Sequence, residues 1–305
     1  MGSASLAARL AQEISAGRWP DGTPLPGVRK LAREVGCSAG TAARAYAALR
    51  DAGVLSGSPR SRFVVARDGT ARAARWSWGV QALRLAGSDD PALDVLVRAA
   101  GDSVAVVAGP RGSVNGIVQL SRGAADASAV HLFDMASGRW NDPLARGALG
   151  GEPVQLVHLW RREQGLVVAR GNPHRIETVA DLGGRRLAWR PPGTGSRLVL
   201  ERLMLAAACG PHPELGEPAE SHLAVAAAVA TGAADAGLAV RAVAESAGLD
   251  WVPVMSEPFE LALDPAAGAA AEPLLAALAE SRLQARLAAM PGYDLSMSGE
   301  VRVAA

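Results

Sequence analysis

The sequence predicts an α/β protein of two domains, a small helix-turn-helix domain followed by a larger α/β domain. The chain of 305 residues is long enough to form two cores. Residues 1–75 hold 12 Lys and Arg against 5 Asp and Glu, whereas residues 76–305 hold 19 against 25. The apolar pattern also changes, from helices joined by short turns to apolar runs that alternate with helices.

The basic charge of the first 75 residues favours a nucleic-acid partner, because phosphate neutralisation supplies most of the non-specific affinity for DNA. A basic surface that is merely solvated is the alternative. Apolar residues at helical spacing predict helices over 5–17, 28–35 and 39 to about 52, with Ser5 and Ser38 as N-caps. The inner face of the third helix is predicted to hold Ala42, Ala45, Tyr46 and Leu49.

The second and third predicted helices form a helix-turn-helix, since a short Gly-containing turn joins them. In such a unit the first turn of the second helix enters the major groove. We therefore expect four residues to face base edges: Ser38, Gly40, Thr41 and Arg44. Apolar runs over 54–55 and 62–65 flank a polar, basic loop and predict a two-stranded wing.

The run TPLPGVRKLAREVGCSAGTAARAYAALRDAGVL resembles the GntR family of winged-helix regulators, over residues 4–66. The resemblance implies a double-stranded operator DNA as partner, with Tyr46 contacting a phosphate or belonging to the core. The candidate DNA-binding residues are Arg29, Lys30, Ser38, Gly40, Thr41, Arg44, Tyr46, Arg60 and Arg62. The sequence departs from the family at Ala39, often arginine there, and in the wing, which lacks Gly-x-Gly. A winged helix that makes only protein contacts is the alternative.

Residues 68–75 lack apolar periodicity and are expected to link a DNA-binding domain (1–67) to a sensor domain (76–305). In the sensor, strands are expected over 82–86, 104–107 and 186–189, each followed by a helix. The expected helices cover 94–100, 114–120 and 198–208. This alternation predicts an α/β fold with largely parallel sheets.

Small hydroxyl residues mark four predicted strand-to-helix junctions. They are Gly87-Ser88-Asp89-Asp90, Gly112-Ser113, Gly193-Thr194-Gly195-Ser196 and Ser221-His222. Each helix N-terminus carries about half a positive charge, so four that converge would suit an oxyanion or a carboxylate. Any one of them alone is by default an ordinary N-cap, and it is the four in one domain that favour a binding site. Two neighbouring carboxylates, Asp89 and Asp90, argue against a pure oxyanion pocket, and an inward-facing Asp89 would favour a ligand with an amine or hydroxyl groups.

The segments AGSDDPALDVL, GTGSRLVLERL and HLAVAAAVATGAADAGLAV, among others, resemble a periplasmic-binding-protein-type sensor domain related to molybdate- and tungstate-binding proteins. The resemblance covers about residues 80–305. It implies a type II periplasmic-binding-protein-like α/β domain of two lobes, about 80–164 with 262–305 and about 165–261. The two crossing segments are expected near 165–168 and 254–261, with the ligand between the lobes.

The candidate ligand-binding residues carried over from this resemblance are Ser88, Asp89, Ser113, Thr194, Gly195, Ser196, Arg197, His131 and His222. Two of them have simpler explanations. Arg197 could pair with Glu201 one helical turn later, and His131 could be an ordinary interior histidine.

An enzymatic role finds little support in the sequence. Lys30, the sole lysine, lies in the helix-turn-helix, which excludes the Schiff-base chemistry of pyridoxal phosphate, and no cofactor is expected. The five histidines and the cysteines Cys37 and Cys209 show no metal-ligand spacing. The absence of a signal peptide or an apolar run of about 18 residues predicts a cytoplasmic protein without membrane contact.

Together these patterns predict a ligand-responsive transcription regulator that is a homodimer by family resemblance. Its effector is expected to be an oxyanion, molybdate or tungstate, or a small organic acid. Closure of the lobes would change the spacing of two recognition helices on DNA. The alternatives are an organic metabolite as effector, a sensor domain that serves only as a dimerisation scaffold, and an unrecognised enzyme tethered to a winged helix.

Overall fold

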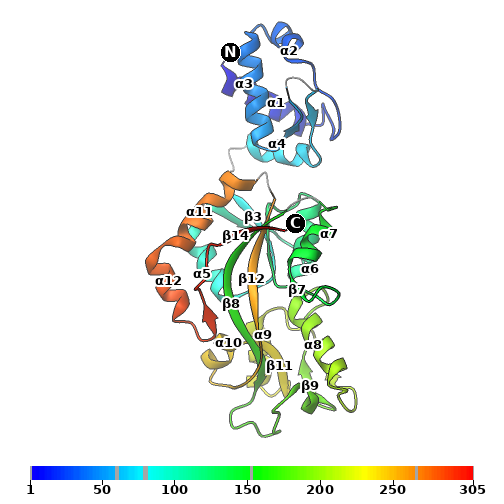
Figure 1. Ribbon diagram of the computed structural model, residues 1–305, viewed down its shortest axis with the longest axis vertical. Coiled ribbons are helices and arrows are strands. Elements are labelled where there is room, and N and C mark those ends of the chain that lie inside the picture. The colour runs from blue at the N-terminus through cyan, green and yellow to red at the C-terminus, as the bar shows by residue number, and fades with distance from the viewer. Residues whose placement is uncertain (1, 59–61, 78–81, 152–153, 265–266, 305) are drawn as a thin grey trace.

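The computed structural model describes residues 2–58, 62–77, 82–151, 154–264 and 267–304. They form an N-terminal winged helix-turn-helix and a larger two-lobed α/β domain (Figure 1). The elements of the N-terminal region are α1 (Ser3–Ser15), α2 (Val28–Val35), α3 (Ala39–Asp51), β1 (Leu55–Ser56), β2 (Val64–Val65) and α4 (Gly69–Ser77).

The helix-turn-helix is confirmed, and its boundaries follow from local chemistry. Gly36 adopts φ +70°, which ends α2, and the Ser38 hydroxyl accepts from the Thr41 N–H at 3.0 Å, which caps α3. The expected cap at Ser5 is wrong, because α1 begins two residues earlier and Gly2 holds the N-cap position. The predicted inner face of α3 is buried, and β1 pairs antiparallel with β2 as the predicted wing strands.

All but the first residue of the expected linker over 68–75 is instead part of helix α4. Its N-terminus is capped from a distant loop, because the Asp21 carboxylate accepts from the backbone N–H of Asp68 (2.6 Å) and of Thr70 (2.9 Å). Ala73 is buried against the core of the first domain. A cap and a packing surface supplied by the tertiary fold thus stabilise a helix whose own sequence shows no periodicity.

The α/β domain begins with β3 and returns to its first lobe after crossing twice. The elements of lobe 1 are β3 (Leu83–Gly87), α5 (Pro91–Ala100), η1 (Gly101–Ser103), β4 (Val104–Val106), α6 (Ser113–Ser121), β5 (Ala127–Val130), β6 (Phe133–Asp134), β7 (Arg139–Trp140), α7 (Asp142–Ala148), α11 (Gly268–Ala279), α12 (Ser281–Ala288), β13 (Tyr293–Asp294) and β14 (Val301–Ala304). The elements of lobe 2 are η2 (Val179–Leu182), β9 (Arg186–Ala188), α8 (Gly195–Ala206), β10 (Glu214–Leu215), α9 (His222–Ala230), β11 (Ala236–Val240) and α10 (Arg241–Ser246).

Two long strands, β8 (Val154–Val168) and β12 (Asp250–Leu263), run side by side through both lobes (Figure 1). The sheet order is β10-β9-β11-β8-β12-β5-β3-β4. Parallel pairing holds within β4-β3-β5 and within β10-β9-β11, but β8 and β12 are antiparallel to their neighbours, so the sheet is mixed rather than largely parallel.

The crossing in β8 lies just before the expected residues 165–168. Arg161 and Arg162 pair with β13 of lobe 1, and from Gln164 onwards the strand pairs with β11 of lobe 2. In β12 the residues from Glu260 onwards pair with β5 of lobe 1, which agrees with the expected crossing over 254–261.

Each part of the fold has its own apolar core. In lobe 1, α5, α11 and α12 pack around Trp160 and Phe259, whose rings stack 5.6 Å apart. In lobe 2, α9 and α10 pack against Ala239 and Val240 at the end of β11. Arg72 of α4 forms an ion pair with Asp264, which directly follows β12. This ion pair joins the N-terminal region to lobe 1. Among the described residues no helix is long and apolar enough to cross a bilayer.

Candidate DNA-binding surface and ligand site

The candidate DNA-binding surface lies along α2 and the first turns of α3. Arg29, Lys30, Gly40 and Arg44 are exposed there. The hydroxyls of Ser38 and Thr41 lie 2.8 Å apart and bond to each other. A Cβ on Gly40 would meet only ordinary contacts, so the protein itself does not require glycine at this position.

Two of the predicted DNA contacts, Tyr46 and Arg62, differ in exposure. Tyr46 is fully buried, and its hydroxyl donates to the carbonyl of Pro26 at 2.7 Å, so it is a core residue and not a phosphate contact. Arg62 of the wing is exposed, whereas Arg60 lies outside the described residues.

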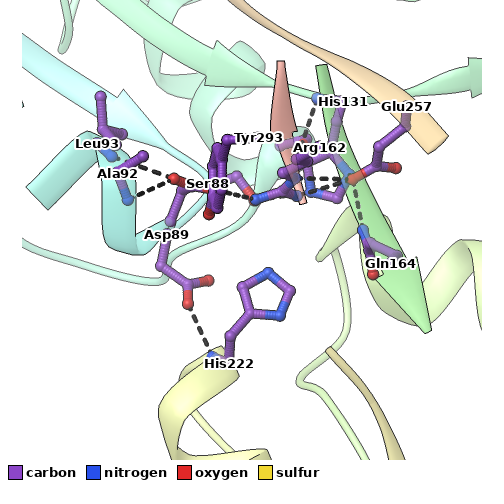
Figure 2. Close-up of polar contacts among 12 residues, drawn as sticks. Ser88, Asp89, Ala92, Leu93, His131, Arg162, Gln164, His222, Glu257 and Tyr293 are labelled. Carbon is purple, nitrogen blue, oxygen red and sulfur yellow. Dashed lines mark hydrogen bonds and ion pairs between the residues drawn. The ribbon is translucent and has the colours of Figure 1, made fainter. Parts of the chain in front are cut away.

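The crossing of β8 and β12 carries a buried charge cluster. The Arg162 guanidinium donates to Asp90 Oδ2 at 2.5 Å and to Glu257 Oε1 at 2.9 Å, and all three side chains are fully buried (Figure 2). Tyr293 also donates to Asp90, at 2.9 Å. Burial alone would raise the pKa of Glu257, but His131 and Arg162 hold it at about 2. This cluster anchors both crossing strands to the start of α5.

His131 connects this cluster to predicted ligand residues. One ring nitrogen, Nε2, lies 2.9 Å from the Ser88 hydroxyl, and the other, Nδ1, lies 3.0 Å from Glu257 Oε1. The Ser113 hydroxyl accepts from the backbone N–H of His131 at 3.2 Å. All four side chains are buried, so Ser88, Ser113 and His131 do come together, within the wall of lobe 1.

The segment Gly193–Ser196 of lobe 2 closes against this wall. A Cβ on Gly195 would lie 2.5 Å from Cε1 of His131, and a Cβ on Gly112 would lie 2.6 Å from the Gly193 carbonyl oxygen. Glycine is therefore required at both positions for this approach. Thr194 and Ser196 are buried here, and the Thr194 hydroxyl donates to the carbonyl of Pro191 at 2.9 Å.

Arg197 forms hydrogen bonds within lobe 2. Its Nε donates to Glu201 at 2.9 Å, and its Nη1 donates to the Arg190 carbonyl at 3.2 Å. The structure therefore favours the alternative role, a partner of Glu201 on the surface of α8.

The four predicted helix N-termini do not form four open anion sites. Asp90 caps α5, and the Gly193 carbonyl accepts from the Val114 N–H at the start of α6. At α9 the Ser221 hydroxyl caps Ala224, while α8 begins without a side-chain cap. Most of the positive helix ends that suggested a dianion are thus already matched by acceptors of the protein itself.

Asp89 and His222 face each other across the two lobes. The Asp89 carboxylate accepts from the His222 backbone N–H at 3.0 Å (Figure 2). It also forms an ion pair with Arg190. The His222 ring is 1% exposed, and neither of its nitrogens has a hydrogen-bond partner. Burial lowers the pKa of His222 well below its usual value, so the ring is neutral at pH 7.

Several residues of this site were missed in the sequence. Arg162, Gln164 and Glu257 lie on the crossing strands, and Arg190 directly follows Trp189 after β9. The only sequence signal was the polar run Arg161-Arg162-Glu163-Gln164 inside an otherwise apolar segment. Among the described residues, no group of three His, Cys, Asp or Glu could hold a metal ion.

Comparison with known proteins places both regions in families. Residues 3–65 match the model for bacterial regulatory proteins of the gntR family, and residues 96–280, more than half of the chain, match the PBP superfamily domain. The uncharacterized protein YvgK of Bacillus subtilis (strain 168) is 28% identical over 195 residues, which are 63% of this chain. The match spans 63% of the length of that relative.

Solved structures with a similar architecture include regulatory domains. One is the Synechocystis CcmR regulatory domain in complex with 2-PG, with TM-score 0.48, 14% identity and coverage of 65% of this chain and 98% of that one. Another is the effector-binding domain of QuiR in complex with shikimate, with TM-score 0.44, 14% identity and coverage of 63% and 94%. On the two family matches, the chain belongs to the PBP superfamily and carries at its N-terminus a DNA-binding region of the GntR family of bacterial regulatory proteins.

Proposed function

We propose that the protein is a cytoplasmic, homodimeric transcription regulator whose operator affinity responds to a small molecule bound between the two lobes. The observation that carries this proposal is the His222 ring, which is 1% exposed with both nitrogens unpartnered. A buried imidazole without partners is costly unless another group supplies hydrogen bonds. A small ligand between the lobes would supply them.

A route from this site to the DNA-binding region runs along β12. The strand passes Glu257 at the crossing and ends next to Asp264, which pairs with Arg72 of α4. Helix α4 in turn packs on the core that holds α1 and α3. We infer that closure of the lobes moves the end of β12, and that α4 passes this movement to the recognition helix.

The oxyanion effector, molybdate or tungstate, is the narrower hypothesis, and the uncapped start of α8 beside buried Ser196 supports it. The occupied N-termini of α5, α6 and α9 weaken it.

The role we propose is binding and not catalysis. A sensor domain that serves only as a dimerisation scaffold is the second candidate.

The test is a thermal-unfolding screen of amines, amino acids, sugars, sugar acids and oxyanions. A true ligand at 100-fold its Kd should stabilise the sensor domain by about 2.7 kcal/mol. The shift should be lost in His222→Gln and kept in the matched control His212→Gln, because His212 is exposed. A shift that survives in His222→Gln would contradict the assignment of this site, and the absence of any shift would favour the scaffold.

A further inference from the structure

An anion-binding position lies on lobe 2, where α9 begins. The Arg190 guanidinium and the His222 backbone N–H both donate towards it, and the start of a nine-residue helix adds a partial positive charge. Arg190 is 3% exposed, and its Nε and both ring nitrogens of His222 are buried without a partner. Buried donors that converge in this way suit a negatively charged oxygen.

Asp89 of lobe 1 already fills this position. Its Oδ2 accepts from the His222 N–H at 3.0 Å and from Nη1 of Arg190 at 3.3 Å, and its Oδ1 pairs with Nη2. Burial alone would raise the pKa of Asp89, but the Arg190 guanidinium and the hydrogen bond from the His222 backbone N–H hold it well below its usual range. The carboxylate is therefore charged at neutral pH and neutralises Arg190.

We infer that Asp89 is a built-in anion that makes the proposed effector site between the lobes select neutral or cationic effectors and reject small dianions. A dianion would either face the Asp89 carboxylate at short range, where solvent screens poorly, or have to displace it from its hydrogen bonds. This inference rests on the proposed function, since it specifies the charge of the effector.

Unpaired acceptors near the crossing support the same selection. Gln164 Oε1 and Glu257 Oε2 are buried and have no hydrogen-bond partner. The Gln164 side-chain nitrogen donates to Glu257 Oε1, so only the amide oxygen of Gln164 lacks a partner. Hydroxyl or ammonium groups of an effector would satisfy these oxygens, whereas a fully deprotonated oxyanion such as sulfate or molybdate has no proton to donate.

The test compares wild type with Asp89→Asn, which keeps the shape but removes the charge. Asp102→Asn is the matched control, because Asp102 is an exposed carboxylate of η1, which directly follows α5 in the same lobe. Binding of sulfate, phosphate and molybdate is measured by calorimetry and by thermal unfolding, against sodium chloride at equal ionic strength.

We expect wild type and Asp102→Asn to show no specific binding of these ions. Asp89→Asn should bind at least one of them at least about tenfold more tightly. Adding Arg190→Gln to Asp89→Asn should abolish the gain. If Asp89→Asn does not fold, Asp89→Ser makes the same comparison.

Two results would overturn the inference. Wild type that binds a dianion as tightly as Asp89→Asn would show that Asp89 excludes nothing, and an Asp89→Asn variant without gained affinity would show that no anion position exists. Operator affinity is measured in parallel without added ions. An operator affinity that no bound compound alters would contradict the proposed function and leave the anion result standing.

Discussion

Glu257→Gln probes the buried ion pair that ties the two crossing strands together. Glu257 and Arg162 are both fully buried, and Oε1 of Glu257 lies 2.9 Å from Nε and from Nη2 of Arg162. A pKa held at about 2 instead of the usual 4.5 corresponds to about 3 kcal/mol of folding free energy. Removing one partner of a buried ion pair typically costs about 3–5 kcal/mol. Because glutamine keeps a hydrogen-bond acceptor, we expect a loss of about 3 kcal/mol.

The same variant predicts a change in pH dependence. The folded-state pKa of Glu257 is lower than its unfolded value, so its contribution is fully present above pH 4.5 and is lost as the pH falls towards 2. Glu257→Gln should lack this part of the acid destabilisation.

Urea unfolding of the sensor domain, followed by near-UV circular dichroism between pH 3 and 7, measures both effects. Glu272→Gln, which changes an exposed residue of α11, is the control. A Glu257→Gln variant within about 0.5 kcal/mol of wild type at pH 7, a change typical of surface substitutions, would refute the reasoning.

Three further predictions concern the N-terminal region. Arg44→Ala should weaken operator binding by about 1–3 kcal/mol in fluorescence anisotropy, while Arg282→Ala on the exposed surface of α12 should not; equal affinities would remove Arg44 from the interface. Tyr46→Phe should lower stability by about 1 kcal/mol, because the Pro26 carbonyl loses its donor, yet leave the operator affinity of the folded protein unchanged. Asp21→Ala should cost about 1 kcal/mol and speed amide exchange at the start of α4, and unaltered exchange there would contradict the capping role.

The sequence was most informative where local chemistry decides the structure. The Ser38 cap, the stop at Gly36 and the apolar spacing in α3 each act within a few residues, so the helix-turn-helix was predictable. Helix α4 was missed because its cap comes from Asp21, which is far away in the sequence. Local propensity carries no record of such a contact.

The ligand site shows the same division. Ser88, Ser113, Thr194 and Ser196 were predicted from their place at strand-to-helix junctions, and the structure buries all of them near the contact between the lobes. Arg162 could not be assigned, because its partners Asp90 and Glu257 come from separate elements. The direction of Asp89 likewise depends on how two lobes close, which spacing along one chain does not encode.

The most direct measurement of the central claim is operator affinity with and without a bound small molecule. An operator is first selected from randomised duplexes, and its Kd is measured at fixed salt with the compound that best stabilises the protein. We predict a change of at least about fivefold, the lower range for allosteric coupling, that is absent in His222→Gln. A compound that binds between the lobes while the Kd for the operator stays the same would contradict the claim.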